Sequence, residues 1–289
     1  MTKLAILSDI HGNLPALEAV MEDMKVFDVD QIVVAGDVVN FGPFSRQTAE
    51  IVIEQNWPVI RGNNEYFLVD YKTPRAPAEW NDPLQFAPIA WLSRQFDQQL
   101  KRKIACWPDS LNLRFEDAPP VLVFHGTPND PWDSIYWTLT DEEIEKLLST
   151  VEAEFVICGH THLPLDRQSG RWHIFNPGSV GVPLDGVFSA SYMILEGNAA
   201  GWKPTFRRVP FDYEAIFQEF EASGYNDQAG PIGRLTVEIY KRARPVLGFL
   251  RWREKFKPGS LLTDELVEEF LVSADWSEFA HRAYLINTE

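Results

Sequence analysis

Five short apolar segments in the first 160 residues each end at a polar cluster that contains glycine. Segments of this length bounded by glycine are typical of buried β-strands, and helical patterns lie between several of them, as in α/β proteins. Ligands of open α/β sheets bind beyond the carboxyl ends of the strands. We therefore expect the five clusters to face one site. The segments are residues 3–7, 31–35, 58–60, 121–124 and 155–158.

The rest of the chain predicts more sheet and then helices. Asn13 is a suitable N-cap for a helix after the first segment, with Pro15 in its first turn. Beyond residue 171, strand-like stretches at 172–175, 190–195 and 205–209 are separated by glycine and proline, which favours added sheet over another βαβ unit. After Pro210 the pattern becomes helical, and Gly224 is a natural helix end.

The polar clusters hold seven side chains with metal-binding groups, and four of the six histidines are among them. Imidazole nitrogens with carboxylate and amide oxygens, and no sulfur, suit Mn²⁺, Fe²⁺, Zn²⁺, Ni²⁺ or Co²⁺. A catalytic zinc ion takes about three protein ligands, so seven suffice for two ions that share a bridging carboxylate. The seven candidates are Asp9, His11, Asp37, Asn63, His125, His160 and His162.

These clusters resemble the ordered motifs of the calcineurin-like metallophosphoesterases. The surrounding residues 8–13, 125–128 and 176–181 are similar to the small bacterial and archaeal branch of predicted phosphodiesterases and diadenosine-tetraphosphatase-like proteins. The resemblance predicts a catalytic domain over residues 1–237 and leaves residues 238–289 as a helical C-terminal extension of unknown role. The motifs are Asp9-Ile10-His11, Gly36-Asp37, Gly62-Asn63, His125-Gly126 and Gly159-His160-Thr161-His162.

The resemblance implies an α/β fold, the four-layer α/β/β/α sandwich of this family, and assigns all seven side chains to catalysis. Asp9, His11 and His162 would hold the first metal ion, and Asn63, His125 and His160 the second. Asp37 would bridge the two. A hydroxide formed between the ions would attack phosphorus in line. The implied activity is that of a phosphodiesterase or dinucleoside-polyphosphate hydrolase; a phosphomonoesterase or protein phosphatase and a non-catalytic metal-binding scaffold are the alternatives.

The sequence also departs from the family pattern. Many relatives carry a histidine at position 64 that helps to protonate the leaving group, and an amide such as Asn64 cannot act as an acid. We therefore expect substrates with good leaving groups, such as phosphoanhydrides and aryl phosphodiesters. Protein serine/threonine phosphatases of this superfamily carry an arginine that grips phosphate where this chain has Phe41, which disfavours the protein-phosphatase alternative. Relatives in the small branch often carry arginines where this chain has Asn129 and Leu184. Substrate specificity should therefore not be copied from relatives.

Three further residues are candidate substrate contacts: Asn64, Arg61 and Trp132. Arg61 precedes the Gly62-Asn63 turn, where it could touch phosphate or form a structural ion pair. Trp132, with Tyr136 and Trp137, follows the His125 loop; these aromatic rings could stack on a nucleobase or pack in the core.

Charge and composition limit the partners. The chain has 26 basic and 42 acidic residues, a net charge of −16, which disfavours a bulk nucleic-acid or anionic-membrane surface and leaves a small phosphorylated substrate, such as a nucleotide. We expect a cytoplasmic protein. The two cysteines are far apart in the sequence, the first apolar run is too short for a signal peptide, and the sequence contains no apolar run of about 18 residues.

The C-terminal extension is charge-segregated. A basic stretch over residues 240–257 precedes an acidic stretch that starts at Pro258. The basic stretch could hold a phosphate-bearing partner. It could also be an exposed helix face that pairs with the acidic stretch or with another subunit, so the extension is a candidate surface for homo-oligomer assembly.

Overall fold

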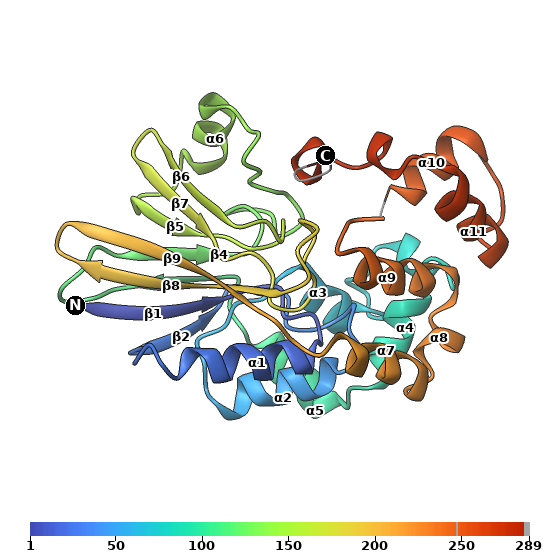
Figure 1. The fold of residues 1–289 in the computed structure, drawn as a ribbon, viewed down its shortest axis with the longest axis horizontal. Coiled ribbons are helices and arrows are strands. Elements are labelled where there is room, and N and C mark those ends of the chain that lie inside the picture. Colours follow the sequence, from blue (N-terminus) through green and yellow to red (C-terminus); the bar gives the residue numbers. More distant parts are fainter. Residues whose placement is uncertain (247, 286–289) are drawn as a thin grey trace.

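The computed structural model describes residues 1–246 and 248–285 and contains two β-sheets (Figure 1). The first has the strand order β2 (Gln31–Val34), β1 (Thr2–Leu7), β8 (Ala190–Asn198) and β9 (Gly201–Val209). The second has the order β3 (Ser110–Leu113), β4 (Val121–Phe124), β5 (Phe155–Ile157), β7 (Trp172–Asn176) and β6 (Leu165–Ser169). In each sheet two or three strands are parallel and the others antiparallel.

The two sheets pack face to face because their strands alternate apolar side chains between two cores. Leu4 and Ile6 of β1 share the central core with residues of β4 and β8, whereas Ala5 and Leu7 point to helices α1 (Leu14–Met24) and α2 (Ser45–Glu54). On the far side of the second sheet, Phe124 packs near α6 (Asp141–Leu148). The layers are therefore helix, sheet, sheet and helix, which confirms the predicted sandwich.

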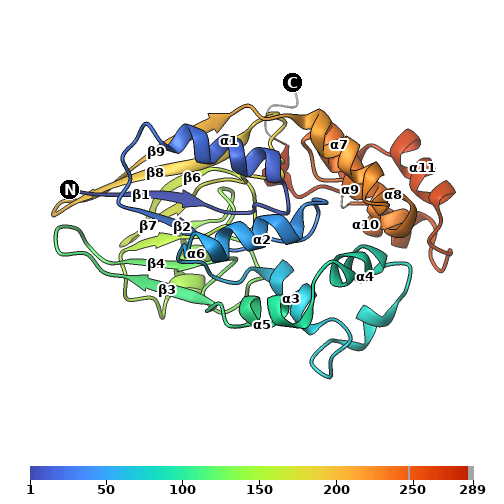
Figure 2. The same ribbon diagram turned by 90° about the horizontal axis from the view of Figure 1, so that it is seen from below.

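The remaining helices gather beyond the carboxyl end of β1, as Figure 2 shows. Side chains of the last three α-helices share the core cluster of α1, and the predicted boundary at residue 237 falls inside α9. The division into two domains stays a prediction. No helix within the described residues is long and apolar enough to cross a bilayer. The helices are α3 (Asn63–Asp70), α4 (Ala87–Arg94), α5 (Gln98–Ala105), α7 (Tyr213–Ala222), α8 (Tyr225–Gln228), α9 (Gly230–Arg242), α10 (Phe249–Phe256) and α11 (Asp264–Ser273).

Three local features differ from the sequence prediction. Residues 58–60 do not form a strand; Val59 makes a single parallel bridge with Val34. The sequence pattern does not predict strands β3 and β6, because both lie at edges of the second sheet and alternate exposed side chains with buried or partly buried ones. The predicted helix start is confirmed, since the Asn13 side chain accepts a hydrogen bond from the Ala16 N–H.

Candidate metal centre

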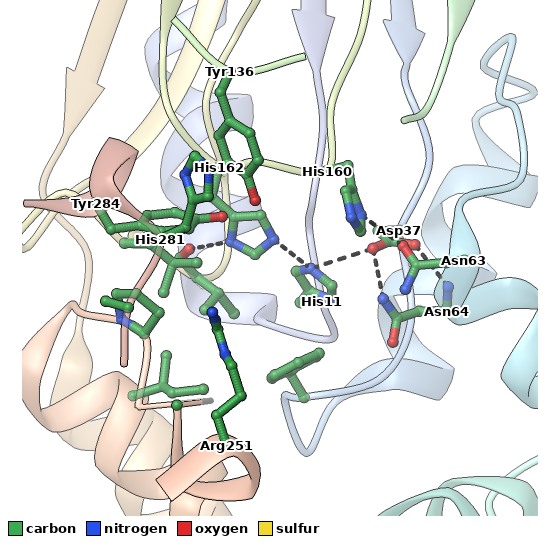
Figure 3. Close-up of a pocket in the computed structure, with 17 residues that line it drawn as sticks. His11, Asp37, Asn63, Asn64, Tyr136, His160, His162, Arg251, His281 and Tyr284 are labelled. Atoms are coloured by element: carbon green, nitrogen blue, oxygen red, sulfur yellow. Dashed lines mark hydrogen bonds and ion pairs between the residues drawn. The ribbon is translucent and has the colours of Figure 1, made fainter. Parts of the chain in front are cut away.

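All seven predicted metal-binding side chains lie together at the carboxyl ends of the central strands, and Figure 3 shows several of them around one cavity. Six are buried, and His160 is partly exposed. Asp9 and His11 follow β1, Asp37 follows β2, His125 follows β4, His160 and His162 follow β5, and Asn63 begins α3. The expectation that the strand-end clusters face one site is therefore confirmed.

The backbone at this site is strained. Asp9, His11, Asp37, His160 and His162 have positive φ angles between 49° and 67°. Residues other than glycine seldom adopt this left-handed conformation, which costs on the order of 1–3 kcal/mol each and occurs often at functional sites. Hydrogen bonds between the first two loops, from the Asp9 and His11 N–H groups to the carbonyls of Gly36 and Asp37, hold part of this geometry.

Asp9, His11 and His162 form the first group of ligand atoms. The Nε2 atoms of His11 and His162 lie 3.1 Å apart, and the Oδ1 atom of Asp9 lies 3.7 Å and 3.3 Å from them. This Oδ1 atom is buried and accepts no hydrogen bond. A buried oxygen without a donor is costly, and a cation between these three atoms would remove that cost.

Asp37, His125 and His160 form the second group, and Asn63 lies within it. The Asn63 Oδ1 atom is 3.2 Å from His125 Nε2 and 2.9 Å from His160 Nδ1. The Asp37 Oδ2 atom is 3.2 Å from His125 Nε2 and 3.6 Å from His11 Nε2. Asp37 therefore lies between the two groups.

Backbone carbonyls orient three of the imidazole rings. The Nδ1 atom is 2.8 Å from the Ala35 carbonyl in His125, 2.6 Å from that of Val182 in His162, and 3.3 Å from that of Val39 in His11. A carbonyl oxygen can only accept, so each Nδ1 carries the proton when the ring is neutral. Each Nε2 then presents a lone pair toward the site, as metal-binding histidines do.

The turn at residues 176–179 supports the site from behind, as the sequence predicts. Asn176 donates a hydrogen bond from Nδ2 to the Gly159 carbonyl at 2.7 Å, next to the loop of His160. The Ser179 hydroxyl donates to the Asp9 carbonyl at 2.8 Å. The turn thus connects the loops that follow β5 and β1.

The pKa values at this site follow from close packing of acids with imidazoles. Burial alone would raise the pKa values of Asp9 and Asp37, but the neighbouring histidines lower both, that of Asp37 to about 2. Burial alone would lower the pKa of His125, but the two carboxylates raise it to about 10. Burial and the charge of His125 lower the pKa of His160 to about 4. Both carboxylates and His160 are therefore in their metal-binding forms near neutral pH.

Glu65 is a positioning residue that the sequence analysis did not identify. The oxygens of its buried carboxyl group accept hydrogen bonds from the N–H groups of Asp37, Val38, Val39 and Gly62, at 2.7–3.2 Å. Burial, with the charge of Asp37, raises the pKa of Glu65 to about 8. The side chain ties the loop after β2 to the start of α3. Glu65 is the third residue of α3, where an acid can accept from the N–H of the N-cap residue, but the N-cap is Gly62, so the Ser/Thr-x-x-Glu pattern that would mark this acid in the sequence is absent.

Asn64 orients Asp37. Its N–H donates to Oδ1 of Asp37 at 2.9 Å, and its side-chain amide donates to Oδ2 at 2.6 Å. Its own oxygen accepts from the Asn40 side chain at 2.6 Å. Asn64 lines the cavity, but these contacts occupy its amide group.

Arg61 and Trp132 do not line the cavity. Arg61 pairs with Asp109 at 2.6 Å and lies over the Tyr66 ring, which is the structural alternative considered above. Trp132 packs on Tyr66 with ring centroids 5.2 Å apart. The structure therefore gives no support to a substrate contact at either residue.

The cavity has a volume of about 240 Å³, and residues from the C-terminal extension form much of its wall. Figure 3 shows Tyr136, from the loop after β4, near His281 and Tyr284 of the extension, with Arg251 of α10 (Phe249–Phe256) on another part of the wall. Leu184, at one of the positions where relatives carry arginine, also lines the cavity. The basic stretch and Tyr136 are recognisable in the sequence, but no sequence pattern places them next to the metal-binding side chains.

Comparison with known proteins identifies the family of the chain. The sequence model of the calcineurin-like phosphoesterase superfamily domain matches residues 2–199. Phosphodiesterase YfcE of Escherichia coli K12 is 29% identical over 208 residues, which are 68% of this chain and 89% of YfcE. Protein MJ0912 of Methanocaldococcus jannaschii is 25% identical over 236 residues, covering 75% of this chain and 90% of MJ0912.

Two solved structures have the same fold. A metallophosphoesterase from Sphaerobacter thermophilus superposes with a TM-score of 0.62 at 27% identity, covering 77% of this chain and 95% of its own. Protein PH1004 from Pyrococcus horikoshii OT3 superposes with a TM-score of 0.68 at 21% identity, covering 85% of this chain and 98% of PH1004. The chain belongs to the calcineurin-like phosphoesterase superfamily and is a metal-dependent phosphoesterase.

Proposed function

We propose that the chain is a dinuclear-metal phosphohydrolase that cleaves phosphodiesters or dinucleoside polyphosphates. One ion would be held by Asp9, His11 and His162. The other would be held by Asn63, His125 and His160, and Asp37 would contact both ions. The observation that supports this most directly is the position of the Asp37 Oδ2 atom, within 3.6 Å of a ligand nitrogen in each group. The nitrogen and oxygen donor set suits Mn²⁺, Fe²⁺, Zn²⁺, Ni²⁺ or Co²⁺.

The residues of the chain would prepare the site for a phosphate ester. Two divalent ions, when bound, would supply a hydroxide nucleophile and neutralise charge on the phosphoryl oxygens. Asp9 and Asp37 contribute a charge of −2 against +4 from the ions, so the loaded site carries about +2 and attracts an anionic ester. Asn64 holds Asp37 in place but offers no acidic proton. We therefore expect fast cleavage only where the leaving group needs no proton.

The test is a metal-by-substrate screen of the full chain. Protein stripped with chelator and reloaded with each of the five metals should carry about two ions per chain and hydrolyse a bis-aryl phosphate faster than a mono-aryl phosphate. An unactivated alkyl phosphate should react much more slowly. Faster turnover of the mono-aryl ester would favour the phosphomonoesterase alternative, and one ion per chain would contradict the dinuclear centre.

A matched pair of variants tests the ligand assignment. His162→Ala should lower the metal content to about one ion per chain, because it removes a nitrogen of the first group. His173→Ala is the control, since His173 pairs with Asp166 at 2.5 Å and does not line the cavity. An unchanged metal content in His162→Ala would remove His162 from the ligand set.

A further inference from the structure

We propose that the C-terminal extension completes the active site and that Arg251 of α10 binds phosphoryl oxygens of the substrate. This inference rests on the phosphohydrolase activity proposed above and adds a substrate-binding residue outside residues 2–199, the part that the family matches. The extension would then be a fixed wall of the cavity, which we call the roof and define as residues 238–246 and 248–285.

The position of Arg251 is the first support. Figure 3 shows its side chain directed from α10 toward His162 and His11. It is the only lysine or arginine among the described residues that line the cavity. A guanidinium group matches the geometry of phosphate oxygens and can donate two parallel hydrogen bonds to them.

The second support is that the Arg251 side chain has no hydrogen-bond or ion-pair partner among the described residues, whereas other basic residues of the same stretch do. Within the described part of the chain, no hydrogen bond or ion pair involves the Arg251 side chain. Lys241 and Arg242 both pair with Glu238, and Lys257 pairs with Glu269 at 2.7 Å. Only some of the basic stretch is therefore used for structure, and Arg251 is left for a ligand.

The roof is attached to the loop that begins with His125. The His281 ring stacks on Tyr136 with centroids 4.0 Å apart and an interplanar angle of 17°. Trp137 Nε1 donates to the Ala283 carbonyl at 3.1 Å, and Arg282 donates to the Thr138 carbonyl at 2.8 Å. These contacts join the end of the extension to the loop that follows β4.

The helix that carries Arg251 is also fixed. Phe249 and Trp252 of α10 are buried, and both rings contact Phe270 of α11 at centroid distances of 5.5 Å. Because residues on either side of Arg251 are anchored in the core, the Arg251 backbone is fixed in the absence of a ligand. Fixing the backbone in advance lowers the entropy cost of binding a ligand through the side chain.

The roof also determines the class of substrate. A cavity of about 240 Å³ is slightly smaller than common ligand sites, which span about 300–1,000 Å³. Tyr136, His281 and Tyr284 give its wall a flat aromatic character. We expect a small phosphate ester with an aromatic or other flat leaving group, and not a phosphorylated protein segment.

The experiment measures binding of inorganic phosphate to the metal-loaded full chain by calorimetry. Arg251→Ala should weaken phosphate binding about tenfold or more, because a charge-assisted hydrogen bond is lost. Arg251→Lys should recover part of that loss. Lys255→Ala is the control: it removes a charge from the same helix, but Lys255 lies over the Phe256 ring and does not line the cavity. Metal content should be equal in all four proteins.

Arg251→Ala, and to a smaller extent Arg251→Lys, should raise KM for the bis-aryl phosphate more than they lower kcat, whereas Lys255→Ala should leave KM unchanged. Phosphate affinity in Arg251→Ala equal to that of the wild type would overturn the proposal. Failure of the proposed function would look different: the loaded wild type would hydrolyse no phosphate ester, while the comparison of phosphate affinities would still report on Arg251.

Discussion

The predicted metal ligands, which we call the cage, and the roof lie on two sides of one cavity and differ in burial and in how their side chains are held. The cage, made of the seven predicted ligand residues, is almost wholly buried, has strained backbone at five positions, and has three imidazoles fixed by backbone carbonyls. The roof contributes an exposed arginine and an aromatic stack held by a few hydrogen bonds. The two proposals above therefore assign metal binding and turnover to the cage residues, and substrate affinity to the roof residues.

The largest effect should come from the cage. His125→Ala removes a nitrogen that lies 3.2 Å from both Asp37 and Asn63, so the second ion should be lost and kcat/KM should fall at least about a hundredfold. Metal analysis and steady-state turnover of the bis-aryl ester measure both effects. His173→Ala again serves as the control. Unchanged turnover would show that His125 is not needed by the cage.

The cage should also make the metal-free chain sensitive to pH. The folded-state pKa of His125, raised to about 10, lies above the ordinary value of 6.5. Its pairing with Asp37 and Asp9 therefore stabilises the fold fully below pH 6.5 and is lost as pH rises toward 10. Chelated protein should lose unfolding free energy over that window in urea titrations. Metal-loaded protein should lose less, because an ion replaces the proton.

Glu65 tests whether the cage depends on the residues behind it. Glu65→Gln leaves fewer acceptors for four N–H groups, so we expect a loss of about 1–3 kcal/mol in unfolding free energy and about tenfold weaker metal binding. Glu143→Gln is a matched control, because Glu143 is the capping-box residue of α6 and is exposed. Equal losses of unfolding free energy and metal affinity in both variants would show that Glu65 acts only as a helix N-terminal cap.

The cage was predictable from sequence because strand ends in α/β sheets converge by topology. Apolar runs that stop at His, Asp and Asn are sufficient to predict that Asp9, Asp37 and His125 lie close together. The carbonyls that orient the imidazoles were not predictable, since every residue has one and only the fold selects Ala35 or Val182.

The roof could not be predicted for a different reason. Nothing in the pattern of residues 240–257 distinguishes Arg251, which lines the cavity, from Lys257, which pairs with Glu269. That distinction depends on how α10 packs against α11 and on contacts between residues far apart in sequence, such as Trp137 with Ala283. An edge strand such as β3 is also hard to predict from the sequence, because its side chains are exposed or only partly buried and give no clear apolar pattern.

The smallest expected effect, in the variant Trp137→Phe, separates the two halves most cleanly. The substitution keeps an aromatic ring but removes the hydrogen bond to the Ala283 carbonyl, which contributes about 0.5–1.5 kcal/mol. Because Arg282 and the His281 stack still hold the roof, KM should rise only about two- to fivefold, with kcat and metal content unchanged. Trp132→Phe, an equally exposed indole without a hydrogen-bonded Nε1 in the described structure, should leave KM unaltered. If Trp137→Phe instead lowered the metal content, the roof would be supporting the cage through the His125 loop, and the separation of turnover from affinity would fail.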